Sequence, residues 1–404
     1  MTIVDRVGNQ RSYTGPPLGN GRSGPLPGTP TLAPLGKFAA VTPTRLLDTR
    51  DGTGGTTKPV GQASSITLQI AGTAGVPATG VTAVVLNVTA TNPTSDSYVS
   101  VYPNGQARTS ASNLNFTPGQ TIPNLVVVPV TNGKIDFYNN SGTVDLIADI
   151  TGYYTTGNGA SYSPTTPTRL LDTRDGTGGT TKPVGQASSI TLQIAGTAGI
   201  PATGVTAVVL NVTATNPTSD SYVSVYPNGQ TRTSASNLNF TPGQTIPNLV
   251  VVPVTNGKID FYNNSGTVDL IADITGYYTT GNGASYSPTT PTRLLDTRDG
   301  TGGTTKPVGQ ASSITLQIAG TAGIPATGVT AVVLNVTATN PTSDSYVSVY
   351  PNGQTRTSAS NLNFTPGQTI PNLVVVPVTN GKIDFYNNSG TVDLIADITG
   401  YYTA

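Results

Sequence analysis

The chain has 404 residues with 19 basic and 19 acidic side chains, and it contains no Cys, His or Trp. Without Cys and His it can form neither disulfides, nor the usual zinc sites, nor a serine–histidine or cysteine–histidine catalytic pair. The charged residues are only 9% of the chain and sum to zero. This argues against nucleic acid or an anionic membrane as a partner.

The first 37 residues occur once, and residues 15–36 contain twelve Gly or Pro. This composition disfavours a folded core and biases the chain toward extended conformations. We therefore predict an extended arm over 1–37, which is either a tether or an anchor that docks along a partner. The anchoring contacts are expected from its apolar and aromatic residues, which are Ile3, Val4, Val7, Tyr13, Leu18, Leu26, Leu32 and Leu35. No apolar run is long enough for a signal peptide or a membrane span, so we expect neither.

The rest of the chain is one unit repeated three times at a spacing of 124 residues. We predict domains at 38–154, 162–278 and 286–402, each of ordinary size for a unit with its own core. Within the core of the units the first copy differs at Val76 and Ala107, where the other copies have Ile and Thr.

Each unit reads as short strands joined by turns. Residues 81–90 and 124–130 are β-branched runs that are apolar on both faces, whereas residues 64–72 and 143–154 alternate between apolar and polar. Asn132-Gly133 predicts a hairpin, Asn104-Gly105 predicts a second turn, and Pro129 indicates an edge strand or a bulge. No segment has a helical period. We predict an all-β fold of three β-sandwich or jelly-roll-like domains.

Fourteen residues, 155–168, separate the first two units. Fully extended they reach at most about 50 Å, which permits either beads in a row or a closed pseudo-threefold cluster. We favour the cluster, because equivalent contacts around a threefold axis use the same pair of surfaces each time. The aromatic residues Phe38, Tyr162 and Tyr286 occupy one equivalent position. We expect each of them to pack on the domain that follows it and to stiffen the joint.

The segment RLLDTRDG occurs unchanged in all three units. Its charged side chains can neutralise one another at a strand end, since an Arg fork binds a carboxylate in fixed geometry. A polar ligand site is the second interpretation, and a calcium site or a reaction centre stays an open alternative. The candidate binding residues are Arg45, Asp48, Arg50, Asp51, Arg169, Asp172, Arg174, Asp175, Arg293, Asp296, Arg298 and Asp299.

Other polar residues offer little chemistry. Asp145 and Asp149 lie on one strand face, about 13 Å apart, which is too far for a glycosidase pair. We interpret Asn87, Asn113 and Asn115 as amides that satisfy backbone groups among apolar strands. All acidic residues are Asp, so an enzyme would have to use Asp, Tyr, Lys or Ser. We expect no enzymatic activity and no required cofactor.

The series RLLDTRDG, VPATGVTAVVLNVTATNP, SNLNFTPGQTIPNLV and DLIADITGYY resembles a tandem all-β repeat of actinobacterial secreted proteins. In that family the repeat often follows cell-wall hydrolases such as peptidoglycan amidases. The likeness covers about 110 residues of each unit and none of the arm. It implies an extracellular, actinobacterial setting and a binding or spacing role.

We expect neither an attached hydrolase nor a signal peptide, and a virion protein of an actinobacteriophage would need neither. Our leading hypothesis is a virion structural protein whose arm binds capsid or tail proteins and whose domains face host-surface glycans. A secreted or wall-bound adhesion module is the alternative, and a hydrolase comes last.

Overall fold

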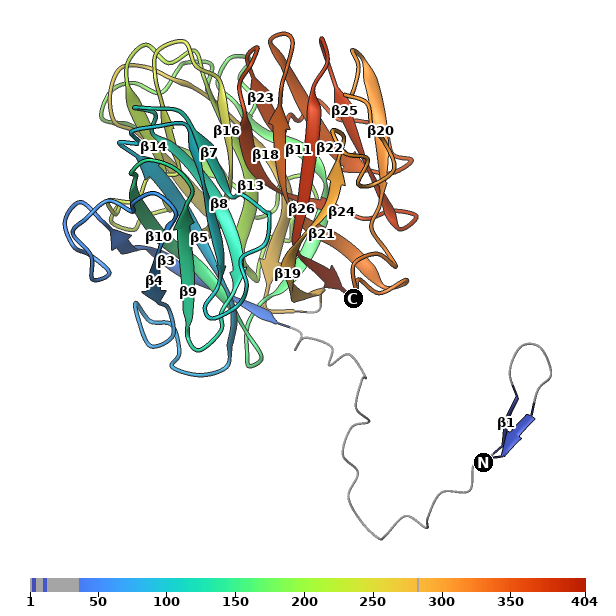
Figure 1. The fold of residues 1–404 in the computed structure, drawn as a ribbon. Helices are drawn as coiled ribbons and strands as arrows, with labels where there is room; N and C mark the ends of the chain where they lie inside the picture. The colour runs from blue at the N-terminus through green and yellow to red at the C-terminus, as the bar shows by residue number, and fades with distance from the viewer. Residues whose placement is uncertain (1, 5–9, 13–35, 282) are drawn as a thin grey trace. The chain divides into compact units, whose positions relative to one another are not determined.

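The computed structural model of the chain describes residues 2–4, 10–12, 36–281 and 283–404 (Figure 1). All regular elements in these residues are β-strands, which confirms the predicted all-β class. Apart from one short pair near the N-terminus, the strands form six four-stranded antiparallel sheets, two from each repeat. The described residues include no helix that is long and apolar enough to cross a membrane.

The start of the predicted arm forms a short two-stranded sheet. Strand β1 (Thr2–Val4) pairs antiparallel with β2 (Gln10–Ser12), and Ile3 lies opposite Arg11. The β-branched residues of β1 favour a strand. The bias toward extended conformations was predicted for residues 15–36, of which the structure describes only Gly36. The other predicted anchoring residues, namely Val7, Tyr13, Leu18, Leu26, Leu32 and Leu35, lie outside the described residues.

Each repeat supplies eight strands, and their bounds recur almost without change. The first repeat has β3 (Lys37–Asp48), β4 (Ser64–Gln69), β5 (Val81–Thr91), β6 (Ser97–Pro103), β7 (Leu114–Phe116), β8 (Ile122–Pro129), β9 (Lys134–Asn139) and β10 (Asp145–Thr155). The second has β11 (Ser161–Asp172), β12 (Ser188–Gln193), β13 (Val205–Thr215), β14 (Ser221–Pro227), β15 (Leu238–Phe240), β16 (Ile246–Pro253), β17 (Lys258–Asn263) and β18 (Asp269–Thr279). The third has β19 (Ser285–Asp296), β20 (Ser312–Gln317), β21 (Val329–Thr339), β22 (Ser345–Pro351), β23 (Leu362–Phe364), β24 (Ile370–Pro377), β25 (Lys382–Asn387) and β26 (Asp393–Thr403).

The two sheets of the first repeat have the strand orders β3-β10-β5-β8 and β4-β9-β6-β7, and the other repeats match them. The prediction for Pro129 is confirmed, because this residue ends β8 at the edge of its sheet, where a missing N–H costs no ladder bond. The residues of β5 from Ala83 onward are buried on both faces, because one face packs on the core of the repeat and the other on a cluster shared by the repeats.

The predicted hairpin at Asn132-Gly133 is only half right. Both residues have positive φ, 55° and 73°, and Thr131 and Lys134 exchange backbone hydrogen bonds of 3.2 and 2.9 Å. The turn therefore forms as its sequence predicts. The strands beyond it separate, because β8 pairs with β5 in one sheet whereas β9 pairs with β4 and β6 in the other.

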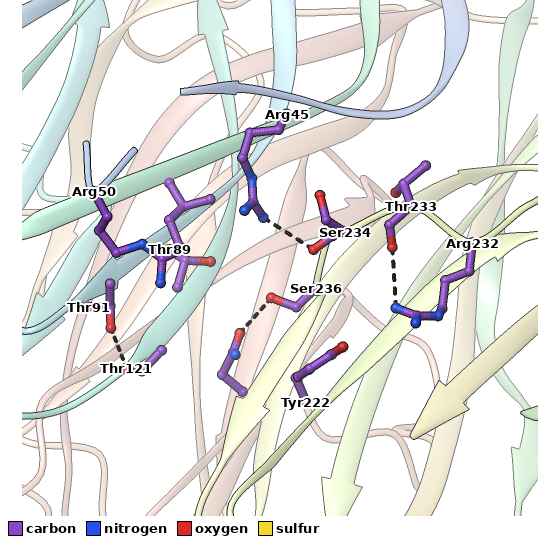
Figure 2. Close-up of a pocket in the computed structure, with 12 residues that line it drawn as sticks. Arg45, Arg50, Thr89, Thr91, Thr121, Tyr222, Arg232, Thr233, Ser234 and Ser236 are labelled. Carbon is purple, nitrogen blue, oxygen red and sulfur yellow. Dashed lines mark hydrogen bonds between the residues drawn. The ribbon is translucent and has the colours of Figure 1, made fainter. Parts of the chain in front are cut away.

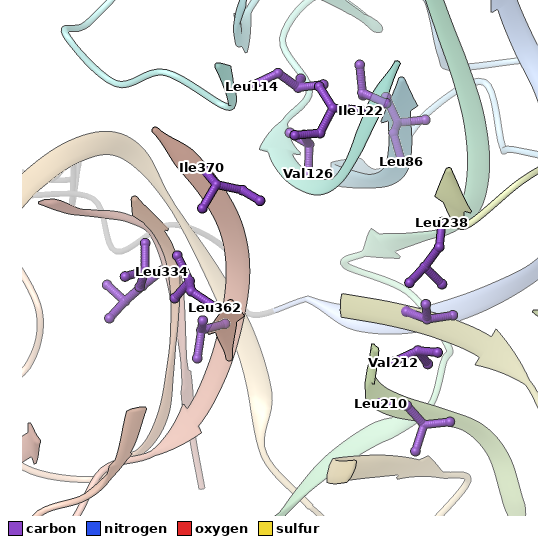
Figure 3. Close-up of a cluster of buried hydrophobic side chains, with 14 of the residues drawn as sticks. Leu86, Leu114, Ile122, Val126, Leu210, Val212, Leu238, Leu334, Leu362 and Ile370 are labelled. Atoms are coloured by element: carbon purple, nitrogen blue, oxygen red, sulfur yellow. The ribbon is translucent and has the colours of Figure 1, made fainter. Parts of the chain in front are cut away.

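The two faces of the first sheet have different partners. Leu86 on β5 and Val126 on β8 belong to the core beneath the second sheet, and Figure 3 shows them beside Leu114 of that sheet. Val85 and Val127, on the opposite face, belong to a second buried cluster that draws residues from all three repeats. The β-branched runs are apolar on both faces because one face fills a repeat and the other joins the repeats.

The predicted fourteen-residue linker is mostly strand. Strand β10 ends at Thr155 and β11 begins at Ser161, which leaves only residues 156–160 as a connection. The prolines of this segment are tolerated because β11 is an edge strand, and its register with β18 shifts between Pro164 and Thr168.

The three repeats form one compact unit, and their contacts run in a circle. Phe38 pairs with Ala160 of the second repeat, Tyr162 pairs with Ala284 of the third, and Tyr286 pairs back with Gly36 of the first. Gly36 and Lys37, which we assigned to the arm, thus take part in sheet pairing. The repeats are arranged as the predicted pseudo-threefold cluster and not as beads in a row.

Aromatic residues fill the centre of this circle. Phe38 stacks on Tyr278 of the second repeat with ring centroids 4.2 Å apart, and it also contacts Tyr154 of its own repeat at 5.3 Å. The equivalent contacts of Tyr162 and Tyr286 close the ring. Each aromatic residue therefore packs on the repeat that it begins, as predicted, and it also stacks on the next repeat around the circle, which was not predicted.

The tyrosine hydroxyls at the centre bind one another. Those of Tyr154, Tyr278 and Tyr402 lie 2.5–2.6 Å apart in all three pairs. Burial raises the pKa of each of these phenols above its ordinary value, so they are neutral and can donate and accept in a ring. The three repeats thus share one polar contact deep within an apolar cluster.

Candidate functional site

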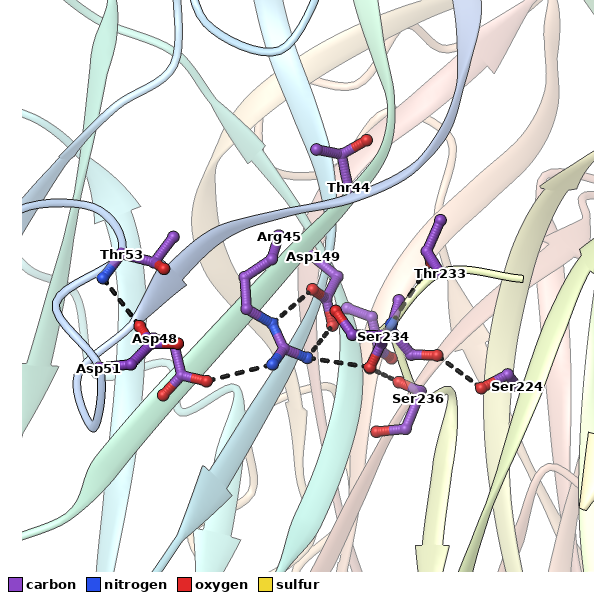
Figure 4. A network of polar contacts seen from close by, with 12 residues as sticks. Thr44, Arg45, Asp48, Asp51, Thr53, Asp149, Ser224, Thr233, Ser234 and Ser236 are labelled. Carbon is purple, nitrogen blue, oxygen red and sulfur yellow. Dashed lines mark hydrogen bonds and ion pairs between the residues drawn. The ribbon is translucent and has the colours of Figure 1, made fainter. Parts of the chain in front are cut away.

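Three charged residues of RLLDTRDG form an ion-pair network with Asp149 at the end of β3, and Figure 4 shows Arg45, Asp48 and Asp149. Arg45 binds both carboxylate oxygens of Asp149 on β10, with Nε–Oδ1 at 2.9 Å and Nη2–Oδ2 at 3.2 Å, and it also reaches Asp48 at 3.1 Å. Arg50 binds Asp48 from the other side at 2.8 and 2.7 Å. Each fork has the bidentate geometry that makes such pairs strong.

The two carboxylates respond in opposite ways to this network. The hydrogen bonds from Arg50 hold the pKa of Asp48 below its ordinary value, because they stabilise the carboxylate. Burial raises the pKa of Asp149, and the Arg45 guanidinium only partly opposes this rise. The same directions recur at Asp172 and Asp296, and at Asp273 and Asp397.

Asp51 does not join the network. Its carboxylate accepts the backbone N–H of Thr53 at 2.9 Å, and so fixes the turn after β3. Asp175 and Asp299 do the same in the other repeats. The predicted mutual neutralisation therefore holds for Arg45, Asp48 and Arg50 but is wrong for Asp51, since a short Asp side chain prefers a nearby backbone donor in a turn.

Both other copies reproduce the network. Arg169 bridges Asp172 and Asp273, and Arg174 binds Asp172. Arg293 bridges Asp296 and Asp397, and Arg298 binds Asp296.

Asp149 is the member that the sequence did not reveal. Its only signal is a second acidic residue in a strand that alternates between apolar and polar residues, and the partner becomes visible only once β10 pairs with β3. Asp145, on the same strand, accepts Thr49 Oγ1 at 2.8 Å and Asn92 Nδ2 at 3.0 Å. The two acids are thus satisfied separately and do not form a catalytic pair.

No metal cluster is apparent around these acids. The part of the chain that the structure describes contains no group of three or more His, Cys, Asp or Glu side chains that could hold an ion. Both oxygens of Asp48 accept hydrogen bonds from arginines.

The network lies at the boundary between repeats. Arg45 Nη2 donates to the carbonyl of Ser234 in the second repeat at 3.3 Å. Asn87 Nδ2 donates to the carbonyl of Ser236 at 2.7 Å, and Asn248 Nδ2 donates to Asn87 Oδ1 at 2.8 Å. The expectation that Asn87 satisfies backbone is confirmed, but the backbone belongs to the neighbouring repeat.

The other two amides act within their own repeat. Asn113 Oδ1 accepts the N–H of Val101 at 2.6 Å, as expected of an amide that satisfies backbone. Asn115 Oδ1 accepts the hydroxyl of Ser112 at 3.0 Å instead.

A cleft opens beside this boundary, with a volume of about 640 Å³. Figure 2 shows Arg45 and Arg50 of the first repeat on one side and Tyr222 and Arg232 of the second repeat on the other. A matching cleft of about 590 Å³ lies between the second and third repeats, and the third boundary has the equivalent bond from Arg293 to the carbonyl of Ser110 at 3.3 Å. We call these spaces the inter-repeat clefts. They combine residues that are far apart in sequence, so no local motif predicts them.

Comparisons with known proteins add little. No protein-family model and no curated protein matches the sequence. A chain from the structure of Sulfolobus turreted icosahedral virus aligns over 86% of this chain and 84% of its own length, at 9% identity and a TM-score of 0.18. A chain from a study of a triple jelly-roll fold and turret assembly in an archaeal virus aligns over 91% of both chains, at 10% identity and a TM-score of 0.19. Scores this low carry no conclusion about fold or function.

Proposed function

We propose that the protein is a non-enzymatic structural component of a virion, which displays three β domains as one body toward the surface of the host cell. The observation that carries the proposal is the closed circle of contacts among the repeats. It makes a threefold body from a single chain, with only residues 156–160 between β10 and β11. Such a body presents every surface feature three times in a fixed arrangement.

We further infer that each repeat is a jelly roll. Numbered within a repeat, the strands follow the orders 1-8-3-6 and 2-7-4-5, and this order of two four-stranded sheets is the double Greek key of that fold. Jelly rolls occur in viral capsid proteins and in lectins. The fold therefore suits both parts of the proposal, assembly into a particle and contact with glycans.

The arm is the proposed anchor to capsid or tail proteins, because it is the only part that does not repeat. The test is deletion of residues 1–35, which leaves Gly36 to pair with Tyr286. We expect the repeats to stay folded, by circular dichroism and thermal melting, while the truncated protein no longer associates with particles in electron micrographs. Normal association of the truncated protein would refute the anchoring role.

A secreted or wall-bound adhesion module is the second candidate. This candidate is supported by the polar inter-repeat clefts, because a cleft that binds a cell surface does not require the protein to be part of a virion. Fractionation separates the two candidates, since a virion component sediments with particles whereas an adhesion module stays with the cell wall.

The proposal includes the absence of catalysis. Asp48, the most prominent acid of the repeated motif, is held by two arginines and is poorly suited to proton transfer. Incubation with peptidoglycan and common polysaccharides is expected to give no turnover. Turnover that disappears in the combined variant Asp48→Asn, Asp172→Asn and Asp296→Asn would contradict it and favour a hydrolase.

A further inference from the structure

We propose that the inter-repeat clefts bind an acidic saccharide, meaning a sugar polymer whose units carry a carboxylate or a phosphate. The inference rests on the proposed surface-binding role and names the ligand class for it. Each site is built from two repeats, so no single repeat contains it.

Arg232 presents a cation to the cleft without a counter-charge. Its guanidinium lies 3.9 Å from the ring centroid of Tyr262, and Nη1 donates to the carbonyl of Thr233 at 3.4 Å. None of the ion pairs among the described residues includes Arg232. The stacking on Tyr262 holds the side chain in place, which reduces the entropy lost when it binds an anion.

Arg50 provides a second donor from the opposite wall. Its side chain is 45% exposed, and it binds Asp48 through Nε and Nη2. No hydrogen bond within the described residues uses its Nη1. The acids that balance the arginines, Asp48 and Asp149, are each 1% exposed and lie behind them. A ligand in the cleft therefore meets guanidinium groups and not carboxylates.

The rest of the lining is neutral and rich in hydrogen-bonding groups. It includes Thr89, Thr91, Ser236 and Asn239, and the aromatic ring of Tyr222, with no Asp among the lining residues. Hydroxyl and amide groups can exchange hydrogen bonds with sugar hydroxyls, and an aromatic ring offers an apolar surface. The volume of about 640 Å³ is in the range of ligand pockets.

Nucleic acid fits this surface poorly. The chain has no net charge, whereas binding to a phosphate backbone uses many basic residues along one stripe. A polymer with spaced charges needs only a few arginines at each site. Three linked sites can then raise the overall affinity by about 10²–10⁴-fold over one site.

The test uses the full chain and titration calorimetry with three probes. Hyaluronan oligosaccharides carry carboxylates, phosphomannan oligosaccharides carry phosphates, and dextran is neutral. We expect binding to one or both acidic probes and none to dextran, and the comparison of the two identifies the acidic group.

The decisive variant replaces Arg232 and Arg356, which line the two clefts, and Arg108, the equivalent residue at the third boundary, with Gln. The control replaces Lys58, Lys182 and Lys306 with Gln, which removes the same charge from exposed positions outside the clefts described above. We expect the arginine variant to lose at least tenfold in affinity and the lysine variant less than twofold. Thermal melting of both shows whether the fold is retained.

A version with Lys at the three arginine positions separates charge from geometry. It keeps the charge but lacks the planar fork, so we expect it to bind between the parent and the Gln variant. The proposal would be overturned if the Arg→Gln variant and the Lys→Gln control lost the same affinity. It would also be overturned if the folded parent bound neither acidic probe. Neither result bears on the arm, whose deletion tests the virion role independently.

Discussion

The contact between repeats depends on a buried amide, and its removal gives the sharpest test of the cluster. Asn248 is 1% exposed. Its Nδ2 donates to Asn87 Oδ1 at 2.8 Å and to the carbonyl of Asn237 at 2.6 Å, and its Oδ1 accepts the N–H of Leu125 at 3.1 Å. Asn87 and Leu125 belong to the first repeat, so Asn248→Ala breaks two bonds across the boundary and one within the second repeat.

The expected cost follows from the groups that are left without partners. Each buried polar group that loses its partner costs about 1–3 kcal/mol. Three such groups predict that Asn248→Ala lowers the free energy of unfolding by about 3–9 kcal/mol, measured by urea denaturation. A loss of this size is a large part of the stability of an ordinary domain.

Hydrogen exchange locates the effect. The repeats share most of their peptides, but Ala107 gives the first repeat a distinct mass where the others have Thr. A peptide over 107–125 therefore comes from the first repeat alone and includes the N–H of Leu125, so we expect it to exchange faster in Asn248→Ala.

The matched control is Asn263→Ala. Asn263 is equally buried, but its Nδ2 binds carbonyls of its own repeat, such as Val184 at 3.0 Å. This variant should lose stability without faster exchange over 107–125. A loss below about 1 kcal/mol in Asn248→Ala, or unchanged exchange over 107–125, would refute the reasoning.

Two further predictions concern the centre and the ion pairs. Tyr162→Phe should lower the free energy of unfolding by about 1 kcal/mol in urea denaturation, because the Tyr162 hydroxyl donates to the carbonyl of Thr275 at 3.0 Å. Phe38→Tyr, at the equivalent position, should raise it by up to the same amount. No change in either variant would contradict this role of the hydroxyl. On acidification the stability should hold until about pH 3.8, the ordinary value for Asp, and fall below it. The lowered pKa of Asp48 stabilises the folded state at higher pH, and this stabilisation is lost as pH falls below the ordinary Asp value. The raised pKa of Asp149 acts in the opposite direction, because the folded protein takes up this proton at a higher pH than the unfolded chain, so stability rises as pH falls toward the ordinary value. A fall in unfolding free energy between pH 6 and 4.5 would contradict these directions.

Local sequence predicted the strands well, because their signals are local. The β-branched run at 81–90 became β5, and the alternation at 64–69 became β4. The turn at Asn132-Gly133 also formed. Its strands nevertheless joined different sheets, since pairing partners are decided by the packing of the whole repeat and not by the turn.

The site was only partly predictable for the same reason. Arg45, Asp48 and Arg50 lie within six residues, so their mutual pairing could be inferred. Asp149 lies 104 residues from Arg45, and Arg232 lies in another repeat. Only the folded cluster brings these residues together, and no periodicity in the sequence marks them.

The near identity of the repeats follows from the way the circle closes. Every repeat presents one surface to the repeat before it and another to the repeat after it, as Asn87 and Asn124 do in the first repeat. A change in a surface residue of one copy therefore alters one boundary and leaves the other two as they were. The two core differences lie elsewhere, since Val76 is buried within its own repeat and Ala107 is on an exposed loop. Positions at the boundary differ as well. Phe38 replaces a tyrosine and keeps its ring stack on Tyr278, whereas Lys37 replaces a serine and donates to Ser161 Oγ at 2.8 Å. The changes in the first copy thus either lie away from the boundaries or keep a contact across them.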